Sequence, residues 1–471
     1  MTVRCPRLVS ASWLTLLGWV GTSVLFAVPG FAGDDAQDKS RYEVGIELKA
    51  HYRDSDDTRF PIPLELPPSL LPPGQDQAFM ETVDPGTHGE VSFVTLWAKA
   101  QFSRNISGKI KVDIIDLSDR NPTGEDREVD VDEAWLRFGQ ETEPGNLAGG
   151  WGSYVKVGKF PKFERQDDRH LESYGLISTA FNRLEDVGAE LGIDLGKHFY
   201  VKASFTQGNP LFFRDPNFLA GDNGTDQIEV IDGVPTLIQR AENGTGFPIF
   251  YDADIDIDEI NFDNPETGLG LGVRLGDEDG YRAADFMLWA YRRDLAAEVD
   301  IGNSFYGGDL DLLRGPSNAI PLPITDGQKE EFGANLWLYL GGFSFFGQYV
   351  DQDLAGLDRT GFEAEVAWSF DLPLFWAIGG RQVLPWLAPA IRYSELDPDF
   401  TAEGPYPAPS VFWDWEKIDL GLRVGLYDDM DLTLEYQDNT FVRLGQDESN
   451  DEFLATLRIG FDRGVGKKGR R

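Results

Sequence analysis

Apolar and polar residues alternate one by one along many short stretches of this chain. In YEVGIELKAHYR, from Tyr42 to Arg53, every second residue from Tyr42 to Tyr52 is apolar or aromatic, and the residues between them are charged, histidine or glycine. A period of two places successive side chains on opposite faces of an extended strand. The stretch is therefore predicted to be a strand with one apolar face and one polar face.

The same alternation recurs along the whole chain. The last such stretch is FLATLRIGF, which puts Phe453, Leu457 and Phe461 on one face. We predict about sixteen strands in all, and the wider gaps between them leave eighteen open. The predicted strands are 42–53, 92–102, 109–115, 133–138, 154–160, 187–195, 199–205, 269–275, 284–292, 331–340, 343–350, 361–370, 386–394, 418–426, 432–437 and 453–461.

Short and long connections alternate between these strands. Short turns such as 196–198 and 341–342 are followed by long polar stretches, although two connections on the short side, 140–153 and 371–385, are longer than expected. The predicted long loops are 54–89, 117–128, 160–184, 208–268, 295–328, 395–411 and 438–452. An even number of period-two strands with this alternation is typical of an all-β transmembrane antiparallel β-barrel, with short periplasmic turns and long external loops. Closure pairs every strand edge, as lipid requires, so the apolar faces are expected to point outward.

The N-terminal segment predicts export. Arg4 and Arg7 precede an apolar stretch from 8 to 28, and small residues at Gly30 and Ala32 fit cleavage of a signal peptide, residues 1–32. An uncleaved membrane anchor is the alternative. The only cysteine, Cys5, lies in this segment, so the exported chain is expected to hold no disulfide and no thiolate metal site. We expect a short periplasmic segment at 33–40, the barrel at 41–461 and a basic tail at 462–471, in the cell outer membrane of a Gram-negative-type bacterium.

The net charge and its distribution limit the functions that the chain can have. A formal net charge of −38 argues against binding nucleic acid through a basic surface, and the acids concentrate in the predicted loops. The inward faces nevertheless carry both signs, and a lumen of about sixteen strands is too wide for side chains to fill, so it is expected to hold water. The basic residues predicted to line it are Lys99, Lys111, Arg137, Lys202, Arg274, Arg392, Arg423 and Arg458.

One stretch carries a more specific signal. Residues Tyr154 to Gly192 read YVKVGKFPKFERQDDRHLESYGLISTAFNRLEDVGAELG. A strand ending in a VGKF-P-F turn is followed by an E-S-x-x-L element and then by an R-x-x-D-x-G-x-E-L strand. The residues concerned are Val157, Gly158, Lys159, Phe160, Pro161 and Phe163, then Glu172, Ser173 and Leu176, then Arg183, Asp186, Gly188, Glu190 and Leu191. This order of motifs resembles the middle of the phosphate-selective porin (O/P type) family, and the barrel pattern extends the resemblance over about 41–461.

The resemblance implies a sixteen-stranded, homotrimeric outer-membrane channel whose third external loop, here 160–184, folds into the pore and carries basic residues that attract anions. In this sequence the anion-attracting candidates are Lys162, Arg165, Arg169 and Arg183. Members usually end on the aromatic residue of the last strand, whereas this chain continues with DRGVGKKGRR, a tail whose role stays open.

We therefore expect a porin that passes small hydrophilic solutes or ions by passive diffusion, with anions such as phosphate as one option. The expected partners are outer-membrane lipid and lipopolysaccharide, two further copies of the chain and the passing solute. A structural or adhesive barrel with a plugged lumen is the alternative, and a barrel hydrolase using His170 with Ser173 is a weaker one. We expect no catalytic residues, cofactor or metal. The identity of the solute, its charge, the pore radius and the position of loop 208–268 stay open.

Overall fold

A computed structural model describes most of the predicted barrel. The described residues are 41–61, 79–82, 86–116, 129–166, 169–181, 185–208, 228–231, 234–237, 262–277, 281–295, 327–372, 377–378, 381–400, 413–427, 429–443 and 445–465. The predicted signal peptide, the segment 33–40 and most of loop 208–268 lie outside this part of the chain.

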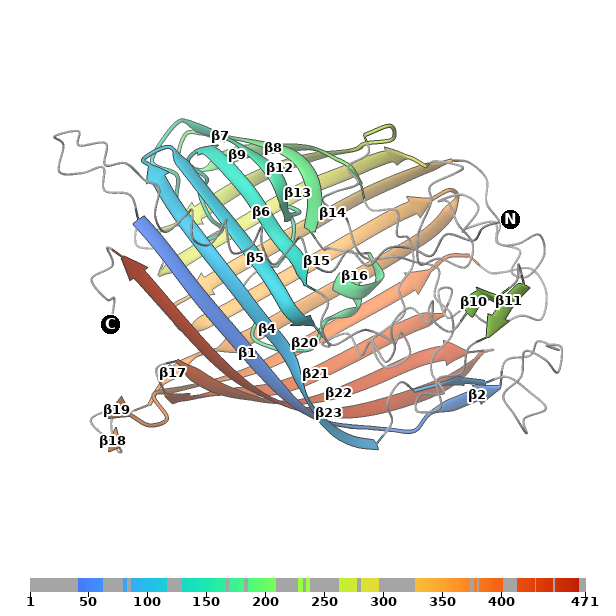
Figure 1. The fold of residues 1–471 in the computed structure, drawn as a ribbon. Coiled ribbons are helices and arrows are strands. Elements are labelled where there is room, and N and C mark those ends of the chain that lie inside the picture. Colours follow the sequence, from blue (N-terminus) through green and yellow to red (C-terminus); the bar gives the residue numbers. More distant parts are fainter. Residues whose placement is uncertain are drawn as a thin grey trace, which may run out of the picture. The chain divides into compact units, whose positions relative to one another are not determined.

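Sixteen long strands form a single closed antiparallel sheet (Figure 1). β1 pairs with both β4 and β23, and β9 pairs with β12, so the sheet has no free edge. A short strand, β17 (Phe370–Asp371), continues β16 and pairs with the same neighbour, β20. The predicted fold class is confirmed. The long strands are β1 (Arg41–Ser55), β4 (Gly86–Ser103), β5 (Ile106–Asp116), β6 (Asp130–Gly139), β7 (Gly152–Pro161), β8 (Glu185–Leu195), β9 (Phe199–Thr206), β12 (Glu266–Gly276), β13 (Arg282–Asp294), β14 (Gln328–Leu340), β15 (Phe343–Leu354), β16 (Leu357–Trp368), β20 (Trp386–Pro398), β21 (Asp414–Tyr427), β22 (Met430–Arg443) and β23 (Gln446–Val465).

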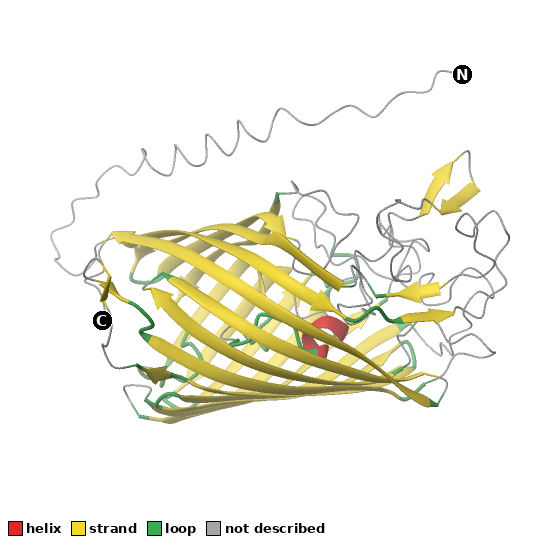
Figure 2. Ribbon diagram, turned by 90° about the horizontal axis from the view of Figure 1, so that it is seen from below, coloured by secondary structure: helices red, strands yellow, loops and turns green. Residues whose placement is uncertain are grey.

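Small elements complete the described structure. One short helix, α2 (Leu176–Ala180), lies inside the barrel (Figure 2). None of the helices in the described residues is long and apolar enough to cross a membrane. The remaining strands form two-stranded pairs: β2 (Arg59–Pro61) with β3 (Phe79–Glu81), β10 (Ile228–Ile231) with β11 (Val234–Leu237), and β18 (Ala377–Ile378) with β19 (Arg381–Gln382).

Apolar side chains cover the outside of the barrel. Val44 on β1 is 54% exposed and Leu271 on β12 is 51% exposed, while Glu363 on the inner face of β16 is 2% exposed. In a water-soluble protein this pattern would be inverted, because exposing apolar surface to water is unfavourable. The outer face therefore matches a lipid environment, as the alternation predicted.

Three sequence boundaries are corrected by the structure. The predicted long loop 438–452 is wrong, because β22 and β23 stay paired as far as Arg443 and Gln446. This outer part of the β22–β23 hairpin carries polar residues where a lipid-facing strand needs an apolar face. Side-chain amides stabilise the pairing there, as in the hydrogen bond from the Asn439 side chain to the Asn450 carbonyl, 3.2 Å. The external connection of β15 and β16 is also a tight turn at Ala355 and Gly356, where φ is 57° and 86°. At the other end, β23 runs four residues past Phe461 to Val465, which pairs with Tyr42 of β1.

Candidate functional site

The connection from β7 to β8, residues 162–184, enters the lumen, and we call it the constriction loop (Figure 2). Its apolar residues Leu176, Ile177 and Phe181 are buried in one cluster with inward-facing aromatics of the wall. The wall residues of that cluster are Tyr200, Trp289, Tyr291, Trp337, Phe346, Trp413, Trp415 and Phe441, together with smaller apolar side chains. Burying such side chains stabilises a contact by about 1.5–3 kcal/mol each, which explains why a loop this aromatic does not stay in water.

Hydrogen bonds fix the constriction loop against the wall opposite its origin. In the strand order, β20 is eight strands from β7 in both directions around the sixteen. The Leu176 backbone N–H donates to the hydroxyl of Ser394 on β20 at 3.3 Å, and Arg392 on the same strand donates to the Ser173 hydroxyl at 2.7 Å. The loop therefore crosses the full width of the lumen.

Further anchors come from β14, β15, β16, β21 and β22. Carboxylates accept backbone N–H groups of the loop, from His170 to Glu365 at 3.0 Å and from Glu172 to Glu435 at 2.9 Å. Basic side chains donate to its carbonyl oxygens, from Lys417 to Tyr174 and from Arg359 to Ala180, both at 2.7 Å. Uncharged amides do the same, since Asn335 and Gln348 both donate to the carbonyl of Glu164. Both amides lie on the inward register of their strands, but they carry no charge, so the pattern of inward charges in the sequence did not single them out.

The wall formed by β1, β4 and β5 borders an open space of 420 Å³. It is lined by Glu43, Glu47, Thr95, Trp97, Lys99, Lys109 and Lys111. All seven lie on the inward register of their strands, so the space belongs to the lumen. The constriction loop reaches this side through Glu172, whose carboxylate pairs with Lys49 at 2.8 Å. Burial alone would raise the pKa of Glu172, but Lys49 holds that pKa below its ordinary value.

The four anion-attracting candidates occupy different environments. Lys162 is buried, pairs with Glu266 and lies 4.6 Å from the centre of the Tyr291 ring. Arg165 pairs with Glu185. Arg169 packs with its guanidinium 4.1 Å from the Tyr174 ring centre and forms no ion pair with another described residue. Arg183 lies outside the described residues.

The eight predicted lumen-lining cations all lie on inward-facing positions, and most are already paired with acids. Lys99 is the exception among the described residues, because it is exposed and forms no ion pair with them. The paired ones are Lys111 with Asp132, Arg137 and Lys202 with Glu141 (both 3.0 Å), Arg274 with Asp194 (2.6 Å), Arg392 with Asp419 (2.8 Å), and Arg423 (2.9 Å) and Arg458 (2.8 Å) with Asp431.

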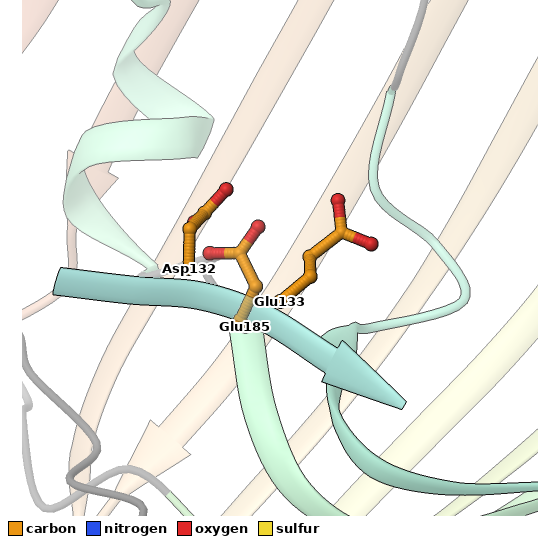
Figure 3. A group of neighbouring side chains, drawn as sticks. All are labelled: Asp132, Glu133 and Glu185. Carbon is orange, nitrogen blue, oxygen red and sulfur yellow. The ribbon is translucent and has the colours of Figure 1, made fainter. Parts of the chain in front are cut away.

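Three carboxylates gather at the external ends of β6 and β8 (Figure 3). One oxygen each of Asp132, Glu133 and Glu185 lies within 4.8 Å of the others, a spacing that suits a cation. Basic side chains already contact each of them: Lys111, Lys109 and Arg165, respectively. We therefore interpret the cluster as a group of ion pairs that connects the constriction loop to the wall, and we assign no metal to it.

The two residues considered for a hydrolase have separate partners. The His170 ring lies 3.1 Å from Glu365 and 3.4 Å from the Ser344 hydroxyl. The Ser173 hydroxyl instead contacts Glu435 and Arg392. Ser173 and His170 therefore do not form a nucleophile–base pair, and both serve to hold the constriction loop.

The closed sheet and its apolar exterior decide the location of the chain. It is an outer-membrane β-barrel. No known family model and no curated protein matches the sequence, so the resemblance to phosphate-selective porins stays a prediction.

Solved structures give likenesses of fold at low identity. The outer membrane channel DcaP of Acinetobacter baumannii is 10% identical at a TM-score of 0.48, over 92% of this chain and 100% of that one. OprB of Pseudomonas putida is 10% identical at a TM-score of 0.46, over 90% of this chain and 94% of that one. An anion-selective porin from Comamonas acidovorans is 10% identical at a TM-score of 0.42, over 90% of this chain and 100% of that one.

Proposed function

We propose that the barrel is a porin, a water-filled channel for passive diffusion of small hydrophilic solutes across the outer membrane, and not an enzyme. The observation that carries the proposal is the 420 Å³ of open lumen beside β1, β4 and β5. The constriction loop is bound to the wall at β20 and reaches β1 only through Glu172, so we expect it to narrow the lumen without filling this space. A plugged structural barrel would have no use for a polar, charged passage of this kind.

We propose further that the passage prefers anions, phosphate included. Lys99 and Lys109 lie directly opposite each other on β4 and β5, where like charges repel. Lys109 is compensated by Glu133, whereas Lys99 remains an exposed positive charge. In a narrow passage of low dielectric, such a charge acts on a passing ion far more strongly than in bulk water. Arg169 is the constriction-loop residue that we expect to act with it. The expected homotrimer and contact with lipopolysaccharide belong to the same proposal.

Planar-bilayer recording tests both parts. The purified channel is expected to conduct, and the double variant Lys99→Ala/Arg169→Ala is expected to shift the reversal potential in a salt gradient toward cations. Arg282→Ala is the matched control, because Arg282 is an exposed cation on the outward register of β13. A barrel that inserts without conducting would refute the channel. A conducting double variant with the reversal potential of the control would refute the anion preference alone.

A further inference from the structure

We infer that residues 140–151, the connection between β6 and β7, form a strap across the periplasmic end of the lumen, and that its Glu141 occupies a binding site for oxyanions on the exit route. The site consists of Arg137, Lys156 and Lys202. This inference rests on the proposed function, since an exit site has a purpose only in a channel.

The Glu141 carboxylate is surrounded by positive charge from three strands. It lies 3.0 Å from Arg137 on β6, 3.1 Å from Lys156 on β7 and 3.0 Å from Lys202 on β9. The Tyr154 hydroxyl lies 3.1 Å from the same carboxylate, but its shorter hydrogen bond, 2.6 Å, goes to Glu190 on β8. All four partners lie on inward-facing positions near the periplasmic ends of their strands, so the site faces the lumen.

The strap continues from this site along the barrel mouth. The Thr142 hydroxyl donates to Asp194 on β8 at 2.9 Å, and Arg274 on β12 donates to the Thr142 carbonyl at 3.0 Å. At Gly145 a Cβ atom would lie 2.9 Å from the Tyr339 ring on β14, and φ there is +79°, so both the close approach and the backbone favour glycine. The strap therefore reaches from β6 past β7, β8, β9, β12 and β13 to β14, across nearly half of the strand order.

The chemistry of the site identifies its ligand class. One guanidinium and two ammonium groups converge on a single carboxylate, and such donors recognise carboxylate and phosphate groups through charge-assisted hydrogen bonds. Glu141 is attached to the chain and takes the place that a solute carboxylate or phosphate would take. Among the described residues, Glu190, 3.3 Å from Lys156, is the carboxylate that would remain in direct contact with these cations if Glu141 left.

A solute oxyanion that has passed the constriction loop thus competes with Glu141 for these three cations. Displacing Glu141 releases the first anchor of the strap and widens the exit. The strap and the constriction loop act in series, and the strap provides the second selection for negative charge.

The test is Glu141→Gln, recorded in planar bilayers with inorganic phosphate as the probe. Glu143→Gln is the matched control, because Glu143 is an exposed acid on the same strap, and its side chain contacts none of the three cations. Removing the competing carboxylate is expected to lower the dissociation constant of phosphate, measured as block of chloride current, by about tenfold, in line with the strength of a charge-assisted hydrogen bond. The reversal potential is expected to move toward anions, while Glu143→Gln behaves like the wild type.

The outcomes separate the two proposals. A silent wild-type channel would refute the proposed function. A conducting wild type with equal phosphate block in both variants would overturn the oxyanion site and leave the channel intact. Should Glu141→Gln fail to insert, Glu141→Asp decides, because it keeps the charge and withdraws the carboxylate by one methylene. Phosphate block tighter than in the wild type would then support the site, and unchanged block would overturn it.

Discussion

Phe181→Ala should detach the constriction loop while leaving the barrel intact. Phe181 follows α2, is 2% exposed, and lies with its ring 4.5 Å from the guanidinium of Arg359 on β16. It also packs against β16 at Gly361, where a Cβ atom would lie 2.6 Å from its ring. Because Phe181 belongs to no strand, the contacts it loses are those of the docked loop and not those of the sheet.

The docking free energy lost in Phe181→Ala can be estimated from the burial of the Phe181 side chain. Truncating a fully buried phenylalanine to alanine costs about 3–5 kcal/mol, and the change also removes the contact with Arg359. At about 1.4 kcal/mol per factor of ten, the docking equilibrium shifts by a factor of at least about 100. The backbone hydrogen bonds of Leu176 and Ala180 to the wall remain possible, so the loop is expected to exchange between docked and released positions.

Single-channel recording and a heat-modifiability gel check this prediction together. The variant should show larger and more variable conductance, with the barrel melting at the wild-type temperature. Phe332→Ala is the matched control, since Phe332 is 51% exposed on the lipid side of β14. Wild-type conductance combined with a lowered melting temperature would refute the reasoning, because Phe181 would then stabilise the sheet and not the docked loop.

Two further predictions concern the register and the response to acid. Leu96→Lys places a charge on the lipid face of β4 and should cost about 2–4 kcal/mol in a urea titration, whereas Gln101→Lys on the lumenal face of the same strand should cost much less; equal costs would contradict the register. Burial alone would raise the pKa of Glu141, but its basic neighbours hold that pKa well below the usual range. This contact therefore stabilises the fold above the pKa of an unfolded glutamate, about 4.3, and is lost as the pH falls through the lower folded pKa. The stability advantage of the wild type over Glu141→Gln should accordingly shrink from pH 7 to pH 3, and a constant difference would argue against the contact.

The local sequence pattern determined the strands and the face that each turns to lipid. Alternation is a property of neighbouring residues, and lipid makes it strict, because one charged side chain on the outer face is costly. Where lipid ends, this constraint ends too. The polar stretch 438–452 therefore looked like a loop, although its amides pair as a ribbon above the membrane.

The partners across the lumen were decided by tertiary structure alone. Lys162 meets Glu266 from 104 residues away, and Lys202 meets Glu141 from 61 residues away. From the sequence only Lys202 had an inward position on a strand, while Lys162 and Glu266 fell in the predicted loops 160–184 and 208–268, and Glu141 in the connection 140–153. A period of two fixes the face of a strand, but it fixes neither the strand that lies opposite nor the path of a loop. Closure of the barrel brings distant strands within reach, and burial then requires each charge to find a partner. Most of the predicted pore cations therefore form ion pairs with acids of the barrel, whereas Lys99 remains exposed to the lumen.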